Sequence, residues 1–168
     1  DLLQHRAVFA QADRLGKFIS IDLADGDLQT DAMQHLAEEF PSLLIAIGHF
    51  GMVTTPGWQK QIALAKNPNV YIESGGITWL FNSEFYPYPS AVDAILEARD
   101  ICGIDKLMWG SDYPRTMTAI TYRMSQDFII KSDKMTAEEK GKFLGLNAAK
   151  FYGFEVKERL PYISHMAE

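Results

Sequence analysis

The sequence predicts an α/β fold in which the strands are parallel and the helices lie outside the sheet. Four short apolar segments of strand length alternate along the chain with stretches of helical periodicity. The segments begin roughly 26 to 37 residues apart, close to the average unit of about 31 residues in a (β/α)8 barrel. The 168 residues hold four such units, or half a barrel. An open, doubly wound sheet is the competing architecture, but no glycine-rich phosphate loop follows any segment.

The four predicted strands are short and rich in apolar residues. The second is apolar almost throughout, as is typical of a parallel strand covered on both faces. The predicted strands are Phe18–Leu23, Leu43–His49, Val70–Ser74 and Leu107–Ser111.

Helical stretches precede, separate and follow these strands, with apolar residues three or four positions apart. Pro56 suits the first turn of its helix, and Gly153 suits the end of the last one. Thr136 and Glu139 form a capping box, and Asn147 is the predicted N-cap of the final helix. The predicted helices are Leu2–Leu15, Thr30–Phe40, Pro56–Ala65, Ser90–Ile101, Ala119–Ile130 and Ala148–Tyr152.

We expect residues 1–168 to form a single domain that is one half of a barrel. The chain begins with Asp1, directly before the predicted helix Leu2–Leu15, so we expect it to be cut from a longer protein. Half a barrel leaves two unpaired strand edges and an exposed apolar core. We therefore expect a homo-oligomer or an association with the missing half of the barrel.

Composition excludes several classes of function. The net charge is −6 and no run of lysine and arginine occurs, so a nucleic-acid partner is not expected. No apolar run approaches the roughly 20 residues of a membrane span.

The one cysteine, Cys102, allows no internal disulfide and fits a reducing compartment, so we expect a cytoplasmic protein. Cys102 has no neighbouring base and no Gly-x-Ser-x-Gly motif is present, which argues against thiol and serine nucleophiles.

Polar side chains follow each predicted strand at its carboxyl end. Asp22, His49, Glu73 and Asp112 stand at these four positions in turn. Both α/β architectures place their sites at this end of the sheet. A histidine and carboxylates that arrive from different strands predict a metal site or an acid–base pair.

Each of these residues also has a structural interpretation. Asp112 could brace the turn that follows it, and His49 could be a buried histidine with its hydrogen bonds satisfied. Glu73 is expected to face outward into a helix interface. Asp22, Asp25 and Asp27 could be loop or cap residues, which is the favoured interpretation for Asp25 and Asp27. The other histidines are expected to be solvated, namely His5, His35 and His165.

Four segments of the chain look like successive motifs of one family: Ala46–Gly51, Asn69–Glu73, Leu107–Pro114 and Asn147–Gly153. They resemble the amidohydrolase-related family (amidohydrolase 2) of metal-dependent TIM-barrel hydrolases and decarboxylases, which includes aminocarboxymuconate-semialdehyde decarboxylase. The third segment is similar to the end of that family's eighth strand, and the fourth to its last helix. Order and spacing agree across most of the chain.

The resemblance implies that the strands are the fifth to eighth of the barrel, which makes the chain its C-terminal half. His49 then matches the metal-binding or catalytic histidine of strand six, and Asp112 the aspartate that binds metal and deprotonates water. Asp22 replaces the family's strand-five histidine, and a carboxylate can still bind zinc or a harder ion such as manganese. The family's His-x-His motif has no counterpart here. Zinc is the expected ion of the complete protein, and the chain alone is not expected to hold a competent site.

The function that the resemblance implies is hydrolysis or decarboxylation of a small carboxylated or cyclic substrate. A divalent ion and Asp112 would activate water, and His49 would give a hydrogen bond or proton to the developing oxyanion. The alternative is a metal-free, non-catalytic barrel or half-barrel that binds a ligand or assembles with a partner chain.

Three further residues are predicted to bind the substrate: Arg115, Trp79 and Tyr113. Arg115 can hold a carboxylate in a bidentate pair. Trp79 belongs to an expected aromatic wall, suited to a planar substrate, which also includes Phe81, Phe85 and Tyr86.

Overall fold

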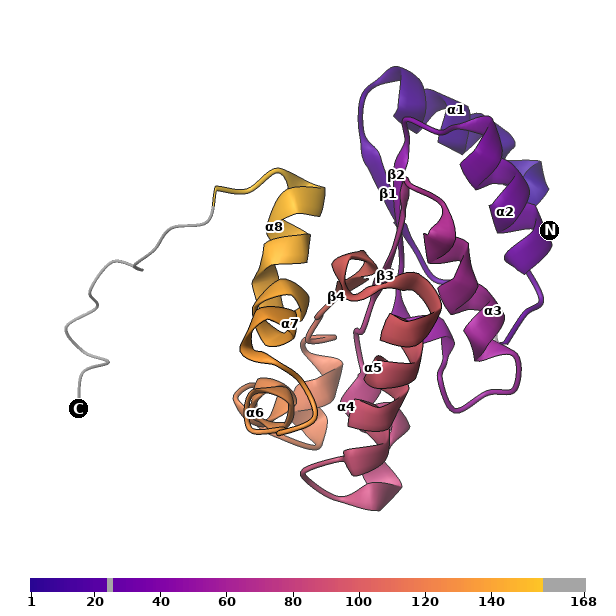
Figure 1. Ribbon diagram of the computed structural model, residues 1–168. Coiled ribbons are helices and arrows are strands. Elements are labelled where there is room, and N and C mark those ends of the chain that lie inside the picture. The colour runs from indigo at the N-terminus through magenta and orange to yellow at the C-terminus, as the bar shows by residue number, and fades with distance from the viewer. Residues whose placement is uncertain (24–25, 156–168) are drawn as a thin grey trace.

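The computed structural model describes residues 1–23 and 26–155. At its centre lies a four-stranded parallel sheet in which the strands follow their order along the chain (Figure 1). Each strand lies within its predicted segment, which confirms the parallel α/β fold. The strands are β1 (Phe18–Ile21), β2 (Leu44–Ile47), β3 (Val70–Glu73) and β4 (Leu107–Met108).

Helices cover both sides of the sheet, with α1 to α3 on one side and α8 on the other (Figure 1). In the described part of the chain, no helix has the length and apolar character that a membrane span requires. The helices are α1 (Arg6–Arg14), α2 (Thr30–Glu39), α3 (Trp58–Ala63), α4 (Ile77–Leu80), α5 (Pro89–Cys102), α6 (Met124–Ile130), α7 (Ala137–Gly141) and α8 (Asn147–Tyr152).

The larger hydrophobic core lies between the sheet and the helices from α1 to α6. Because side chains alternate along a strand, one set of positions faces these helices. Ile45, Ile47, Val70, Ile72 and Leu107 occupy that set and are fully buried. Burial of one such side chain stabilises the fold by about 1.5–3 kcal/mol.

The opposite face of the sheet packs against α8. Ala46, Tyr71 and Met108 lie on this face and form a second buried cluster with Phe151 of α8. The rings of Tyr71 and Phe151 meet edge to face, with centroids 5.1 Å apart. Helix α8 therefore covers part of the sheet face opposite to α1, α2 and α3.

Several predicted helix starts differ from the structure. Helix α1 begins at Arg6, after a 3₁₀ turn over Leu2–His5. Helix α3 begins at Trp58, because Gly57 before it adopts a left-handed conformation (φ +89°), so Pro56 is not in its first turn. Helix α5 begins at Pro89, which takes the first-turn position instead. Helix α6 begins at Met124 and not at Ala119, after a 3₁₀ turn over Arg115–Thr118.

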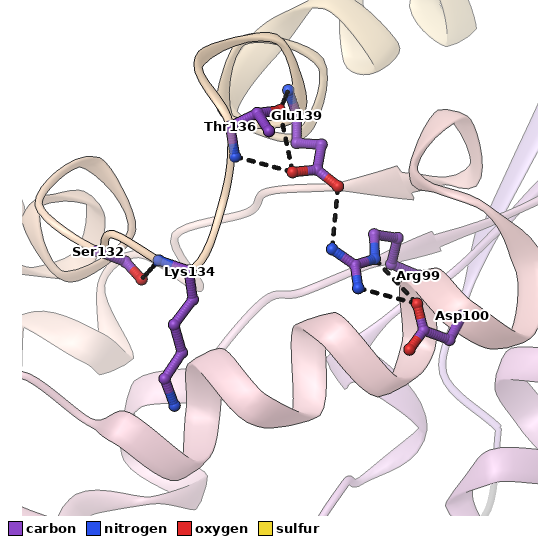
Figure 2. Close-up of polar contacts among 6 residues, drawn as sticks. All are labelled: Arg99, Asp100, Ser132, Lys134, Thr136 and Glu139. Carbon is purple, nitrogen blue, oxygen red and sulfur yellow. Dashed lines mark hydrogen bonds and ion pairs between the residues drawn. The ribbon is translucent and has the colours of Figure 1, made fainter.

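The predicted capping box at the start of α7 is confirmed. Thr136 Oγ1 accepts a hydrogen bond from the Glu139 N–H at 3.2 Å, and Glu139 accepts one from the Thr136 N–H at 2.8 Å. Figure 2 shows that the same carboxylate also reaches Arg99 of α5, at 3.0 Å, while Arg99 pairs with Asp100 on its other side. The cap therefore also ties α7 to α5.

Asn147 is not an N-cap, contrary to the prediction. The chain runs from α7 through a π-helical turn (Lys142–Leu146) directly into α8, so Asn147 lies inside a continuous helical segment. Its buried side chain donates instead to the carbonyls of Ile104 and Leu107, both at 2.7 Å. These bonds hold α8 against the start of β4.

We expect Asn147→Ala to lower the free energy of unfolding by about 2 kcal/mol, because one buried and one partly buried carbonyl lose their donor. Urea denaturation measures the change. Asn82→Ala, at an exposed position, serves as the control and should have little effect. Equal stability of the two variants would contradict the role of Asn147.

Candidate active site

The candidate site lies at the carboxyl end of the sheet, on the face that also carries α8. Its centre is the imidazole of His49, which follows β2. Nδ1 of His49 lies 2.8 Å from Oδ1 of Asp22, and Nε2 lies 3.6 Å from Oδ1 of Asp112. One half-buried ring therefore joins carboxylates that come from the ends of β1 and β4.

An unusual backbone turn sets the position of His49. His49, Phe50, Gly51 and Met52 are all left-handed, with φ of +54°, +49°, +64° and +53°. Each non-glycine residue in this conformation costs roughly 1–2 kcal/mol. The fully buried ring of Phe50, which stacks on Trp58, anchors the turn. Strain of this kind concentrates at functional sites.

Asp112 is also left-handed, with φ +51°. Its Oδ2 accepts a hydrogen bond from the indole N–H of Trp79 at 2.6 Å, while Oδ1 faces His49. Trp79 comes from α4, a short helix in the long loop after β3 that the sequence did not predict. The two oxygens of this carboxylate therefore have different partners.

The charges around His49 raise the pKa of its imidazole. Partial burial alone would lower that pKa, but the hydrogen bond to Asp22 and the charges of Asp22, Asp112 and Glu73 outweigh burial. The protonated form therefore stabilises the fold. That stabilisation is fully present below the unfolded-state pKa of about 6.5 and is lost as the pH rises through the higher folded-state pKa.

We expect Asp22→Asn to lower the pKa of His49, because the substitution removes the carboxylate that accepts the hydrogen bond from Nδ1. Titration of the histidine ring protons by NMR measures the midpoint. His35 is the internal reference, since it is exposed and pairs with Glu39 on α2, on another part of the surface. An unchanged His49 midpoint in the variant would contradict the pairing.

Glu73 belongs to this site, contrary to the expectation that it faces outward. It lies two residues after Tyr71 on β3, so both side chains point to the sheet face that packs against α8. Burial raises the pKa of the Glu73 carboxyl, although a backbone hydrogen bond from Gly75 and the charge of His49 oppose the rise. The period of two along β3 is the sequence signal that could have located Glu73.

Glycines at the strand ends make room for these side chains. A Cβ on Gly48 would lie 2.3 Å from Asp22 Oδ1, and one on Gly110 would lie 1.3 Å from Glu73 Oε1. Both distances are far shorter than any real contact, so neither position has space for a larger residue with the present arrangement.

A cavity of about 210 Å³ opens beside His49. Its lining includes Asp22, Leu23, Gly48, His49, Met52, Gln61, Trp79 and Arg115. A larger groove of about 460 Å³ lies elsewhere, between the start of α5 and the end of α6, and is lined by Tyr86, Phe128 and Lys131 among others. We take the smaller cavity as the candidate site, because His49 and Asp22 line it and Asp112 faces His49.

The predicted substrate-binding residues divide into two groups. Arg115 and Trp79 line the cavity, with the guanidinium carbon of Arg115 4.2 Å from the centroid of the indole ring. Tyr113 is 71% exposed and is not among the lining residues. Of the expected aromatic wall, Phe85 is 82% exposed and Tyr86 lines the other groove, so Trp79 alone of these four reaches the cavity.

The predicted metal ligands do not converge on one point. A catalytic zinc site needs about three protein donors and an open position. Both ring nitrogens of His49 face carboxylates, and Asp112 Oδ2 is taken by Trp79. Among residues 1–23 and 26–155, no group of three histidine, cysteine, aspartate or glutamate side chains is placed to hold an ion. The described residues thus do not fit a complete metal site.

Comparison with known proteins places the chain in a family. Residues 8–154 match the amidohydrolase family, so the chain belongs to it. The uncharacterized protein y4mH of Sinorhizobium fredii is 30% identical over 158 residues, which cover 88% of this chain and 50% of that protein. The family that the four motifs resemble is therefore confirmed.

Solved structures share the fold at low sequence identity. An amidohydrolase from Burkholderia multivorans with bound zinc is 17% identical, with a TM-score of 0.71. The match covers 89% of this chain and 57% of that protein. A putative 2-pyrone-4,6-dicarboxylic acid hydrolase from Pseudomonas putida is 22% identical (TM-score 0.72; 94% of this chain, 60% of that one). A manganese complex of 5-carboxyvanillate decarboxylase from Novosphingobium aromaticivorans is 18% identical, with a TM-score of 0.60. The match covers 88% of this chain and 51% of that protein. The chain thus spans between half and three fifths of the length of these proteins.

Proposed function

We propose that the complete protein is a hydrolase or carboxy-lyase for a small carboxylated or cyclic substrate. The observation that carries the proposal is the position of His49, between Asp22 and Asp112 at the wall of a cavity that Arg115 also lines. A histidine with two carboxylates can exchange protons with a substrate, and an arginine can hold an anionic group beside them. Membership of the amidohydrolase family supports the same class of reaction.

The proposed roles follow from the geometry. Asp112 Oδ1 is the proton acceptor for the attacking water or for the substrate. His49, whose pKa the hydrogen bond to Asp22 raises, gives a hydrogen bond or proton to the oxyanion or leaving group. Arg115 binds a substrate carboxylate while it is stacked on Trp79. Tyr113, exposed beside Asp112, is proposed to contact the part of the substrate that extends from the cavity.

We propose a divalent ion, zinc or manganese, for the complete protein, because relatives of this fold contain these ions. His49, Asp22 and Asp112 are the candidate donors in this chain, and further donors would have to come from the other half of the barrel. Because the described donors do not converge, we assign no reaction step to the ion.

A panel of carboxylated ring compounds tests the proposal. We would follow hydrolysis of 2-pyrone-4,6-dicarboxylate by absorbance and decarboxylation of 5-carboxyvanillate by chromatography, each before and after chelation. Turnover that His49→Asn abolishes would support the proposal, and metal analysis of the active protein would identify the ion. Ligand binding without turnover by the complete protein would favour the non-catalytic alternative instead.

We also propose that the chain associates with the other half of a barrel or with a second copy. Val8, Leu15 and Phe18 are 58%, 52% and 47% exposed beside β1, which pairs with β2 alone among the described strands. Exposed apolar groups beside an unpaired strand favour association. Light scattering after size exclusion distinguishes the two partners, and a monomer of 18.9 kDa at micromolar concentration would exclude the second copy.

A further inference from the structure

Three interactions converge on the indole of Trp79. Its N–H donates to Asp112 Oδ2 at 2.6 Å, and the guanidinium of Arg115 lies over its face at 4.2 Å. The imidazole of His49 lies 5.9 Å from the indole centroid, at an angle of 60°. One side chain therefore contacts the proposed base and the proposed anion-binding residue, and it borders the proposed acid.

We infer that Trp79 is a positioning residue: its N–H holds Asp112 so that Oδ1 faces His49, and its ring sets Arg115 beside them. The inference rests on the proposed function for its catalytic meaning, but its geometry can be tested without turnover. Of the two oxygens of Asp112, the one bound to the indole is no longer free to turn toward the reacting group. The carboxylate is thereby fixed in a single orientation.

Gly76 makes this position of the indole possible. The residue is left-handed (φ +75°), and a Cβ on it would lie 2.0 Å from Nε1 of Trp79 and 3.0 Å from Oδ2 of Asp112. A side chain at Gly76 would therefore occupy the space of the hydrogen bond itself. Gly76 provides a second way to break the bond while Trp79 remains in the chain.

The indole N–H can be observed directly. The chain contains three tryptophans, so ¹⁵N-labelled indole gives well-separated NMR peaks, and the peak missing from Trp79→Phe is that of Trp79. We expect Asp112→Asn to move this peak further than those of Trp58 and Trp109, because a hydrogen bond to a charged acceptor becomes one to a neutral amide. Gly76→Ala should move it as well. A Trp79 peak that stays in place in both variants would overturn the inference.

Trp109→Phe is the matched control. The indole of Trp109 is also half-buried and also donates a hydrogen bond, to the carbonyl of Ser125 at 3.1 Å, but it does not line the cavity. This variant should leave the Trp79 peak unchanged. The peak of Trp79 could respond as expected while no compound of the panel is turned over. That result would contradict the proposed function but support the hydrogen bond from Trp79 to Asp112.

Once a substrate is found, two substitutions separate the two tasks of Trp79. Trp79→Phe keeps a ring under Arg115 but removes the donor, so we expect kcat to fall about tenfold or more with KM little changed. Trp79→Leu also removes the ring, so KM should rise in addition. Equal kinetics for Trp79→Phe and the native protein would contradict the positioning of Asp112.

Discussion

Asp112→Asn is expected to lower turnover by about 10²- to 10⁴-fold, the range that a positioned acid or base contributes. Asparagine has the shape of aspartate and tolerates a left-handed backbone well, so the φ of +51° at this position remains accessible. Its side-chain oxygen can still accept the hydrogen bond from Trp79. What it loses is the ability to take up a proton, and kcat/KM for the substrate found in the panel measures that loss.

A matched control separates the loss of charge from the loss of a base. Asp105→Asn also removes one carboxylate, but Asp105 lies at the surface, where it pairs with Lys142 at 2.9 Å. We expect this variant to retain its activity and stability. Thermal unfolding should show both proteins folded, and near-normal turnover by Asp112→Asn would refute the role of Asp112 as a base.

Gly110→Ala is expected to destabilise the protein by about 3 kcal/mol or more, because the new methyl group overlaps a buried carboxyl. The added Cβ would lie 1.3 Å from Oε1 of Glu73, so that side chain must leave its place. Departure of Glu73 also breaks the hydrogen bond that its carboxylate accepts from Gly75. Chemical denaturation of the variant measures the loss.

Two further variants show whether the carboxyl of Glu73 causes the effect. In the Glu73→Ala background the space over Gly110 is open, so Gly110→Ala should cost at least about 1 kcal/mol less there. Gly145→Ala is the control, since no other heavy atom lies within 4 Å of its added Cβ. Purely additive effects of Glu73→Ala and Gly110→Ala would exclude the overlap as the cause.

The sheet could be predicted from the sequence because its signal is local and repeated. Each strand is a short apolar run between helices, and the paired residues of β1 and β2 extend in register over all four positions. The ends of the helices are less predictable, since they depend on single residues. Gly57 delays the start of α3 past Pro56, and the π-helical turn before α8 makes Asn147 an interior residue.

The composition of the site could be predicted only in part. His49, Asp22 and Asp112 stand at the ends of strands, where parallel sheets gather their polar groups. The hydrogen bond from Trp79 to Asp112 joins residues 33 positions apart and depends on a short helix and a left-handed glycine. Neither feature leaves a periodic pattern. The apolar run of β3 does not show which face Glu73 occupies, whereas its spacing of two from Tyr71 does.

The left-handed turn after β2 has a consequence for how the protein responds to heat. Three of its four residues have side chains that oppose the conformation, so this segment stores free energy that the packing of Phe50 must offset. A segment of this kind is expected to rearrange at lower temperature than the sheet, since local opening needs less free energy than global unfolding. We therefore expect His49 to leave its carboxylate partners on heating while the four strands are still paired.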